Sequence, residues 1–229
     1  MQEEPSYPAA KNLVHRLLPF LEKDYGLVIP KRAYPSVSVG SPKFFEEIGG
    51  NGVYNVLENR IILNENRYYD VPGALYATGS LVGEEAFGHF PRMYFVKKNK
   101  VKTSVGKKEC GKIEKEAVSE FYGYMGKKML FASLEKRECA DILFGENGLE
   151  PLASKETHRA KMKALFAAAH LLHWNREKAV RTRQAHRKGY KAASKISLDD
   201  IHDREAFFSL PTEEAERRFL KPNPDMSGL

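Results

Sequence analysis

The chain has 229 residues, 42% of them hydrophobic and 11% aromatic, which provides enough apolar side chains for a buried core and excludes wholesale disorder. No apolar run approaches the ~20 residues that cross a bilayer, and two cysteines are too few for a disulfide framework, so we expect a soluble cytoplasmic protein without a membrane partner. The formal net charge is +7, and one segment near the C-terminus carries it.

The first predicted elements are a helix and a small group of strands. Residues 10–26 place leucines on one helical stripe, and within them Pro19 should kink or split the helix and Gly26 should end it. A short alternating strand follows, and then residues 52–64 have hydrophobic ends around a polar turn, which is typical of a β-hairpin. We therefore predict a small antiparallel sheet near residues 36–64.

Three longer helices are predicted after the hairpin, over residues 74–90, 112–137 and 155–195. The fold class is therefore α+β, predominantly helical with a small antiparallel sheet. We divide the chain into a domain at residues 1–150 and a basic helical C-terminal extension, residues 151–229, packed on it.

The last predicted helix holds the positive charge. Residues 155–195 contain 12 Lys and Arg against 2 Glu, whereas the rest of the chain has 25 basic against 28 acidic residues. Such a stripe either contacts the phosphates of a nucleic acid, without reading its bases, or is a solvated helix face. The side chains that would make the phosphate contacts are Arg176, Arg181, Arg183, Arg187 and Lys188.

Acids and a histidine gather in the first of the three longer helices. Glu84 and Glu85 precede His89, and Glu85 and His89 are four residues apart, so an α-helix presents both on one face. This is the spacing with which the two histidines of a zincin helix hold one zinc ion. On the next predicted helix, Glu116 and Glu120 repeat the same spacing.

The order of these elements resembles the gluzincin metallopeptidases, and above all their small archaeal minigluzincin type, over roughly residues 10–130. The segment Glu116-Ala-Val-Ser-Glu120 is similar to the glutamate helix of thermolysin-like enzymes. This resemblance implies a zincin-like fold, with Glu116 as a zinc ligand, Glu120 as the acid that orients the site, and a peptide or protein as the bound partner.

The His-Glu-x-x-His motif of that family is missing, and three registers of the degenerate motif are open. With Glu85 and His89 in the two histidine places, the general-base position holds Ala86. With Glu84 in the first place, Glu85 keeps the base position but Gly88 replaces the second histidine. A register one residue earlier keeps Glu84 as the base and loses both histidines.

No register supplies both a full ligand set and a base, and hydrolysis by a metal-activated water needs both. We therefore expect a gluzincin-like metal-binding protein whose peptidase activity is altered or lost, with Glu84 and Glu85 as the candidate catalytic acids. The first register predicts that Glu85, His89 and Glu116 bind zinc or another divalent metal. The alternatives are surface acids beside a hydrogen-bonded histidine, and a basic nucleic-acid-binding or scaffold protein without catalysis.

A short internal similarity links the two later helices. Glu120-Phe-Tyr-Gly-Tyr124 resembles His186-Arg-Lys-Gly-Tyr190. In each segment a Gly beside a Tyr permits the close approach of a neighbouring helix, so the similarity indicates two helices packed in related ways, unless it is a coincidence. In this context His186 is expected to face the first site.

Overall fold

The computed structural model describes residues 7–41, 43–45, 52–64, 79–101, 112–136, 138–139, 142 and 180–221. These residues form a predominantly helical structure with one three-stranded sheet, which confirms the α+β class. None of the helices that they form is long and apolar enough to span a membrane.

Two short helices begin the described chain where the leucine stripe predicted one split helix. α1 spans Tyr7–Leu17 and α2 spans Pro19–Tyr25. Pro19 begins α2 because proline has no N–H to donate, and the first turn of a helix is the one place where that donor is not needed. Gly26 ends α2 in the left-handed conformation, with φ 67°.

The sheet contains β1 (Ser36–Gly40), β2 (Gly52–Asn55) and β3 (Arg60–Asn64), in the order β1-β3-β2. The predicted hairpin forms: β2 and β3 are antiparallel, and Asn59 turns the chain between them with φ 47°. However, β1 runs parallel to β3, so the sheet is mixed and the prediction of an antiparallel sheet was wrong. The alternation of side chains within a strand carries no information on the direction of its neighbour.

Residues 79–98 form one continuous helix that changes its winding in the middle. It is π-helical over Gly83–His89 (η3) and α-helical again over Phe90–Lys98 (α5). The backbone N–H of Phe90 donates to the carbonyl of Glu85, five residues back, which is the π-helical bond. Pro91 follows directly and has no N–H, so no hydrogen bond from that position opposes the wider winding.

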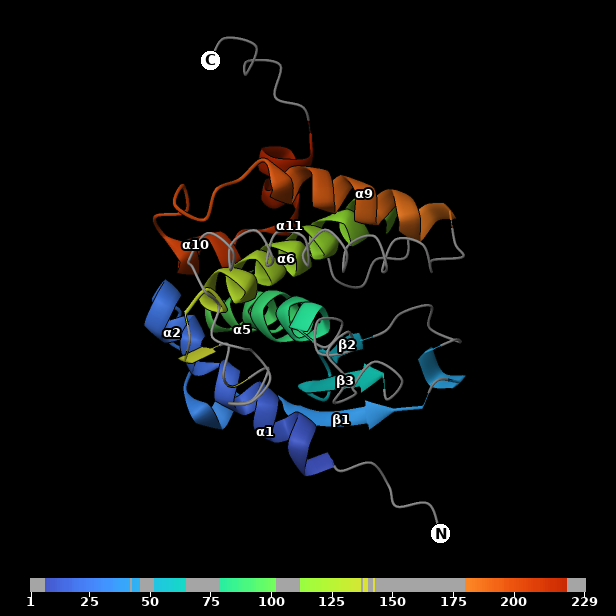
Figure 1. Cartoon of the computed structure of the whole chain (residues 1–229). Helices are drawn as coiled ribbons and strands as arrows, with labels where there is room; N and C mark the ends of the chain where they lie inside the picture. The colour runs from blue at the N-terminus through green and yellow to red at the C-terminus, as the bar shows by residue number, and fades with distance from the viewer. Residues whose placement is uncertain are drawn as a thin grey trace, which may run out of the picture.

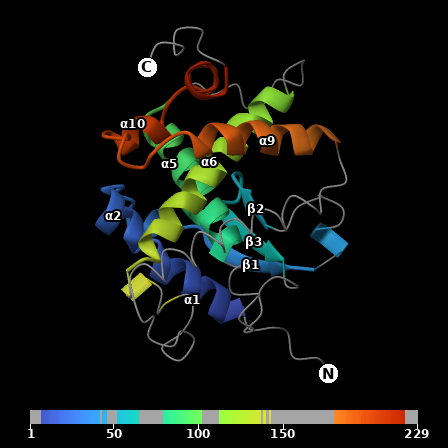
Figure 2. The ribbon, with the colours of Figure 1, turned by 45° about the horizontal axis from the view of Figure 1, so that its top comes forward.

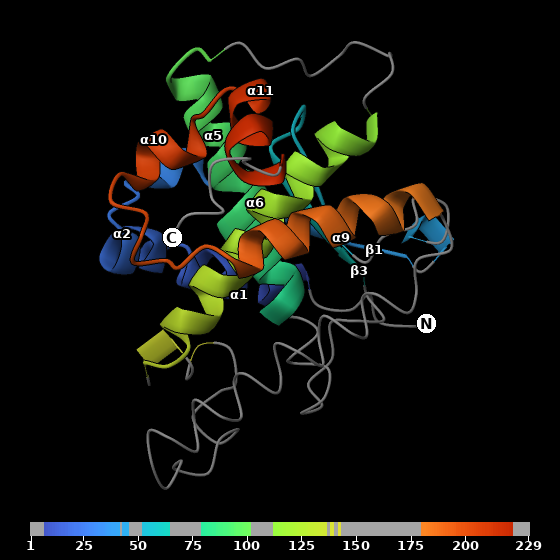
Figure 3. The same ribbon diagram turned by 90° about the horizontal axis from the view of Figure 1, so that it is seen from above.

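Two further helices are stacked in order on η3. α6 (Lys112–Ser133) packs on η3, and α9 (Val180–Ser194) packs on the other side of α6. Figure 1 shows the resulting layers, from α1 and the sheet through the helix of η3 and α5 to α6 and then α9. Figure 2 and Figure 3 show α9 crossing over α6.

Glycines set the distance between η3 and α6. A Cβ atom added at Gly126 would lie 2.2 Å from the backbone nitrogen of Gly88, and one added at Gly88 would lie 2.5 Å from the carbonyl oxygen of Tyr122. The two backbones are therefore in direct contact, with no space for any side chain between them at these positions. This contact fixes how the side chains of the two helices meet on either side of it.

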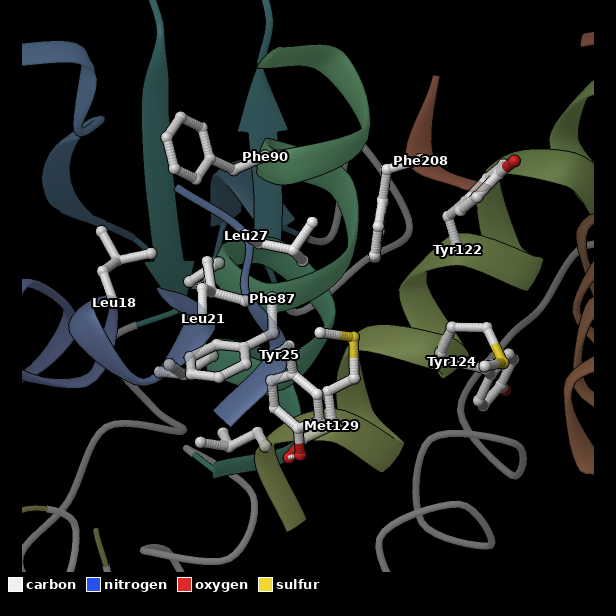
Figure 4. Close-up of a cluster of buried hydrophobic side chains, with 14 of the residues drawn as sticks. Leu18, Leu21, Tyr25, Leu27, Phe87, Phe90, Tyr122, Tyr124, Met129 and Phe208 are labelled. Atoms are coloured by element: carbon white, nitrogen blue, oxygen red, sulfur yellow. Dashed lines mark hydrogen bonds between the residues drawn. The ribbon is translucent and has the colours of Figure 1, made fainter. Parts of the chain in front are cut away.

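An apolar core lies at the other end of the η3–α6 interface. Figure 4 shows Leu21 and Tyr25 of α2 gathered with Phe87 of η3 and Met129 of α6. The Tyr25 hydroxyl donates to the carbonyl oxygen of Met129 at 2.5 Å, so the one polar atom of that ring is satisfied inside the core. Each fully buried side chain of this size contributes about 1.5–3 kcal/mol to stability.

The C-terminal described segment closes over α5 and α6 with α10 (Arg204–Phe208), α11 (Thr212–Ala215) and the π-helical η4 (Glu216–Leu220). The Tyr122 hydroxyl donates to the carbonyl of Phe207 at 2.8 Å, and the buried Arg92 guanidinium donates to the carbonyl of Phe208 at 2.7 Å. The predicted domain boundary near residue 150 and the first part of the predicted basic helix lie outside the described residues.

Candidate metal centre

Three helices bring a group of metal-ligand side chains together inside the protein. Glu84 comes from η3, Glu120 from α6 and His186 from α9, and one ligand atom of each lies within 4.8 Å of the others. Glu84 and His186 are each 5% exposed, and the Glu120 side chain is 17% exposed. This group could hold a metal ion, because two carboxylates and an imidazole are all metal ligands.

The π-helical winding decides which acid lies beside His89. In a π-helix the residues of one face are five apart rather than four, and Oε1 of Glu84 accordingly lies 4.0 Å from Nε2 of His89. On its other side, Nδ1 of His89 lies 3.4 Å from the Ser119 hydroxyl. Burial lowers the pKa of His89, so this imidazole is neutral near pH 7.

Two glycines provide the space in which these polar side chains meet. A Cβ atom at Gly123 would lie 3.0 Å from Nε2 of His89 and 3.1 Å from Cγ of Glu84. A Cβ atom at Gly189 would lie 2.7 Å from Cβ of Glu120, so α9 approaches α6 at its glycine. No other residue type fits at either position without moving the candidate ligands.

The two similar five-residue segments face each other across this contact. Glu120 and His186, the first residues of the segments, pair with 2.5 Å between Oε2 and Nδ1. The last residues, Tyr124 and Tyr190, meet edge to face with their ring centres 5.4 Å apart. The internal similarity therefore marks a real packing relation between α6 and α9.

A lysine lies within the same buried group. The Lys127 ammonium is 2.5 Å from Oε2 of Glu84 and 4.7 Å from the centre of the Tyr124 ring, and its side chain is 3% exposed. Burying charges costs free energy that only close pairing offsets. Glu84 lies against the Lys127 ammonium, and Glu120 lies against the His186 imidazole.

Glu85 lies next to the group in a different environment. It is 4% exposed, and the backbone N–H of Tyr54 on β2 donates to it. Burial raises the pKa of Glu85 well above its usual value, and the negative charges of Glu84 and Glu120 raise it further. Glu85 therefore keeps its proton to a higher pH than an exposed glutamate does.

The group in the structure differs from the ligand set expected from the sequence, which was Glu85, His89 and Glu116. Glu84 stands beside His89 because the α-helical spacing that favoured Glu85 does not apply in η3. Glu116 is exposed, whereas Glu120, one turn further along α6, belongs to the group. Sequence reasoning assigned Glu120 only an orienting role.

Two members of the group were weakly signalled or missed. His186 was expected to face the site only through the internal similarity, and Lys127 gave no signal beyond its position seven residues after Glu120 on the same predicted helix face. For the basic helix, Arg187 and Lys188 are exposed on α9. Arg176 and the side chains of Arg181 and Arg183 lie outside the described residues.

Comparison of the chain with protein-family models, curated proteins and solved structures finds no match. The geometry of Glu84, Glu120 and His186 is therefore the basis for inferring a function.

Proposed function

We propose that this chain is a divalent-metal-binding protein and that Glu84, Glu120 and His186 hold the ion. The observation that carries the proposal is their convergence from three helices, with ligand atoms within 4.8 Å of one another. Ligands bound at about 2.0–2.2 Å stand roughly 3–4.4 Å apart around one ion, so small side-chain movements complete the site.

The ligand chemistry narrows the choice of metal. Two carboxylates with one imidazole suit zinc, and they suit manganese or iron as well, whereas the group has no thiolate to favour softer ions. Zinc is therefore the first ion to test and manganese the second.

Within this proposal the chain is an atypical or degenerate metallopeptidase rather than an active one. Glu84 and Glu120 are used as ligands, and Glu85 is buried with the backbone N–H of Tyr54 donating to it. None of these three acids is then left to accept a proton from water, which hydrolysis requires. We expect no chelator-sensitive cleavage of casein above the buffer blank; turnover at ~1 per second or faster would contradict this part of the proposal.

Calorimetric titration of the chelator-treated protein with zinc tests the metal site. We expect binding of one ion per chain, and Glu120→Gln should weaken it at least about 100-fold, because loss of a ligand exceeds the 10- to 100-fold typical of supporting residues. Glu116→Gln is the matched control, since Glu116 lies one turn earlier on α6 and is exposed.

The control should bind zinc like the wild type, and circular dichroism should show both variants folded. Weak binding by Glu116→Gln with unchanged binding by Glu120→Gln would favour the site expected from the sequence. Wild-type binding no stronger than that of Glu120→Gln would remove the proposed site.

One observation favours a second candidate function, the binding of nucleic acid through its phosphates. Arg187, Lys188, Lys191 and Lys195 are all exposed at the surface that α9 presents, whereas Gly189 faces Glu120. The affinity for duplex DNA or RNA should then fall with salt concentration with a log–log slope of at least about 3, at about 0.9 per neutralised phosphate. Reversing the charges of Lys188 and Lys191 should abolish binding; no binding by the wild type at low salt would remove this candidate.

A further inference from the structure

Lys127 lies on the same face of α6 as the candidate ligand Glu120. Positions seven apart on an α-helix share one face, and α6 directs this face at η3. A Cβ atom at Gly83 would lie 2.9 Å from Cα of Lys127, so the lysine backbone is in contact with η3. The side chain is 3% exposed and ends at Glu84, with its nitrogen 2.5 Å from Oε2.

The charges of the buried group explain what this lysine does. Without a metal, the carboxylates of Glu84 and Glu120 are paired with the Lys127 ammonium and with His186. A divalent cation bound to the two carboxylates neutralises them by itself. The ammonium is then one positive charge too many, held within a few ångströms of the ion in a medium where like charges repel strongly.

We infer that Lys127 is an internal cation that stands in for the metal, and that metal uptake displaces its ammonium from Glu84. This inference rests on the proposed function, because it concerns the same three ligands. Lys127 stabilises the metal-free protein by pairing with Glu84 and lowers the affinity of the site for metal by the same contact. The centre therefore loads only when the metal concentration is high enough to compete with the lysine.

A second contact of the ammonium does not depend on Glu84. The Tyr124 ring lies 4.7 Å from the same Lys127 nitrogen, and an aromatic face attracts a cation even without a carboxylate. The ammonium can therefore move away from Glu84 and keep its contact with this ring. This displacement needs no movement of α6, whose backbone is fixed against η3 at Gly126.

Zinc titration and metal-free thermal unfolding of Lys127→Met and Lys127→Gln test the inference. Met removes the charge at similar length, and Gln removes the charge but still donates a hydrogen bond, so the pair remains informative if one variant folds poorly. Both should bind zinc at least about tenfold more tightly than the wild type, equivalent to about 1.4 kcal/mol, and both should melt at a lower temperature without metal.

Lys128→Met is the matched control. The Lys128 ammonium donates to the carbonyl oxygens of Ala193 and Ile196 rather than to a carboxylate. Its loss should lower stability by loosening the α6–α9 contact but leave zinc affinity within about threefold of the wild type. An equal gain in zinc affinity for the Lys128 and Lys127 variants would overturn the inference.

The outcomes separate the inference from the proposed function. If the wild type binds zinc and both Lys127 variants bind it no more tightly, the inference fails and the metal site stands. If only the Lys127 variants bind zinc, the lysine occupies the cation position permanently, so the proposed function and the displacement by metal both fail. If no variant binds zinc, both fail.

Discussion

The middle part of α6, residues 116–127, and its last part, residues 128–133, are held in place by different interactions. In the middle part, the half-buried Glu120 and the buried Lys127 are charged side chains, and Gly126 brings the backbone of α6 against η3. In the last part, Met129 and Leu130 pack among apolar side chains of the core. The middle part therefore depends on backbone contact and charge balance, and the last part on apolar volume.

Stability alone accounts for the apolar last part of α6 but not for the charged middle part. Buried apolar side chains stabilise a fold directly, whereas a buried ion pair is often no better than an apolar pair of the same size and is costly when one partner is lost. Charged side chains of a helix that are buried in the protein interior are unusual for a hydrophobic core. Such exceptions are concentrated at functional sites. The proposed role of Glu84, Glu120 and His186 as metal ligands would account for this departure.

The largest effect is expected when the backbone contact between the middle part of α6 and η3 is broken. The Cβ atom of Gly126→Ala would lie 2.2 Å from the nitrogen of Gly88 and 2.4 Å from the carbonyl oxygen of Gly83, both backbone atoms that cannot turn away. We expect a loss of more than about 4 kcal/mol in the free energy of unfolding, which is exceptional for one substitution, or no folded protein at all.

Gly26→Ala provides the comparison for that loss in urea unfolding. A Cβ atom there meets nothing within 4 Å, and only the positive φ of 67° opposes it. It should cost roughly 1–2 kcal/mol. Equal losses in the two variants would show that η3 and α6 are not in backbone contact.

A smaller loss of stability is expected from a substitution in the last part of α6. Leu130 is fully buried, so Leu130→Ala should lower the free energy of unfolding by about 2–5 kcal/mol. The number of zinc ions bound should not change, because the substitution leaves the three ligands and their glycine contacts intact. A loss of zinc binding in the folded variant would mean that the metal site also depends on the apolar packing of the last part of α6.

The smallest expected effect is a pH dependence of stability that comes from the buried Glu85. The raised pKa of Glu85, due to burial first and then to Glu84 and Glu120, favours the folded state while the carboxyl is protonated. This contribution is fully present below the unfolded pKa of about 4.3 and is lost as the pH rises through the higher folded pKa.

Glu85→Gln should therefore be more stable than the metal-free wild type near neutral pH, by less than the loss in Leu130→Ala, and its advantage should shrink toward pH 4. Urea unfolding at several pH values measures this trend. The exposed Glu116→Gln should follow the wild-type curve. An advantage of Glu85→Gln that grows toward low pH would contradict a raised pKa of Glu85.

Local signals in the sequence predicted the fold where short-range chemistry decides it. Pro19 and Gly26 gave the split and the end of the first helix, and the hairpin followed from its polar turn. The parallel direction of β1 was not predictable in this way, because strand direction depends on which neighbour the chain returns to.

The candidate site was predicted in part, and its ligand set was displaced by one local change. Helical spacing identified the segment with Glu84, Glu85 and His89, but an α-helical spacing selects the wrong neighbour where the winding is π-helical. His186 joins from a helix far along the chain, and only its Gly-Tyr context pointed to the site. Charge pairing in three dimensions brought in Lys127, and no one-dimensional pattern encodes it.

X-ray diffraction from crystals grown with zinc, measured on both sides of the zinc absorption edge, tests the central claim most directly. We expect one strong anomalous peak per chain, bounded by Glu84, Glu120 and His186, with the Lys127 ammonium moved away from Glu84. The same peak should be missing from crystals of Glu120→Gln. A peak coordinated by Glu116, or crystals with zinc bound only at surface side chains, would contradict the account.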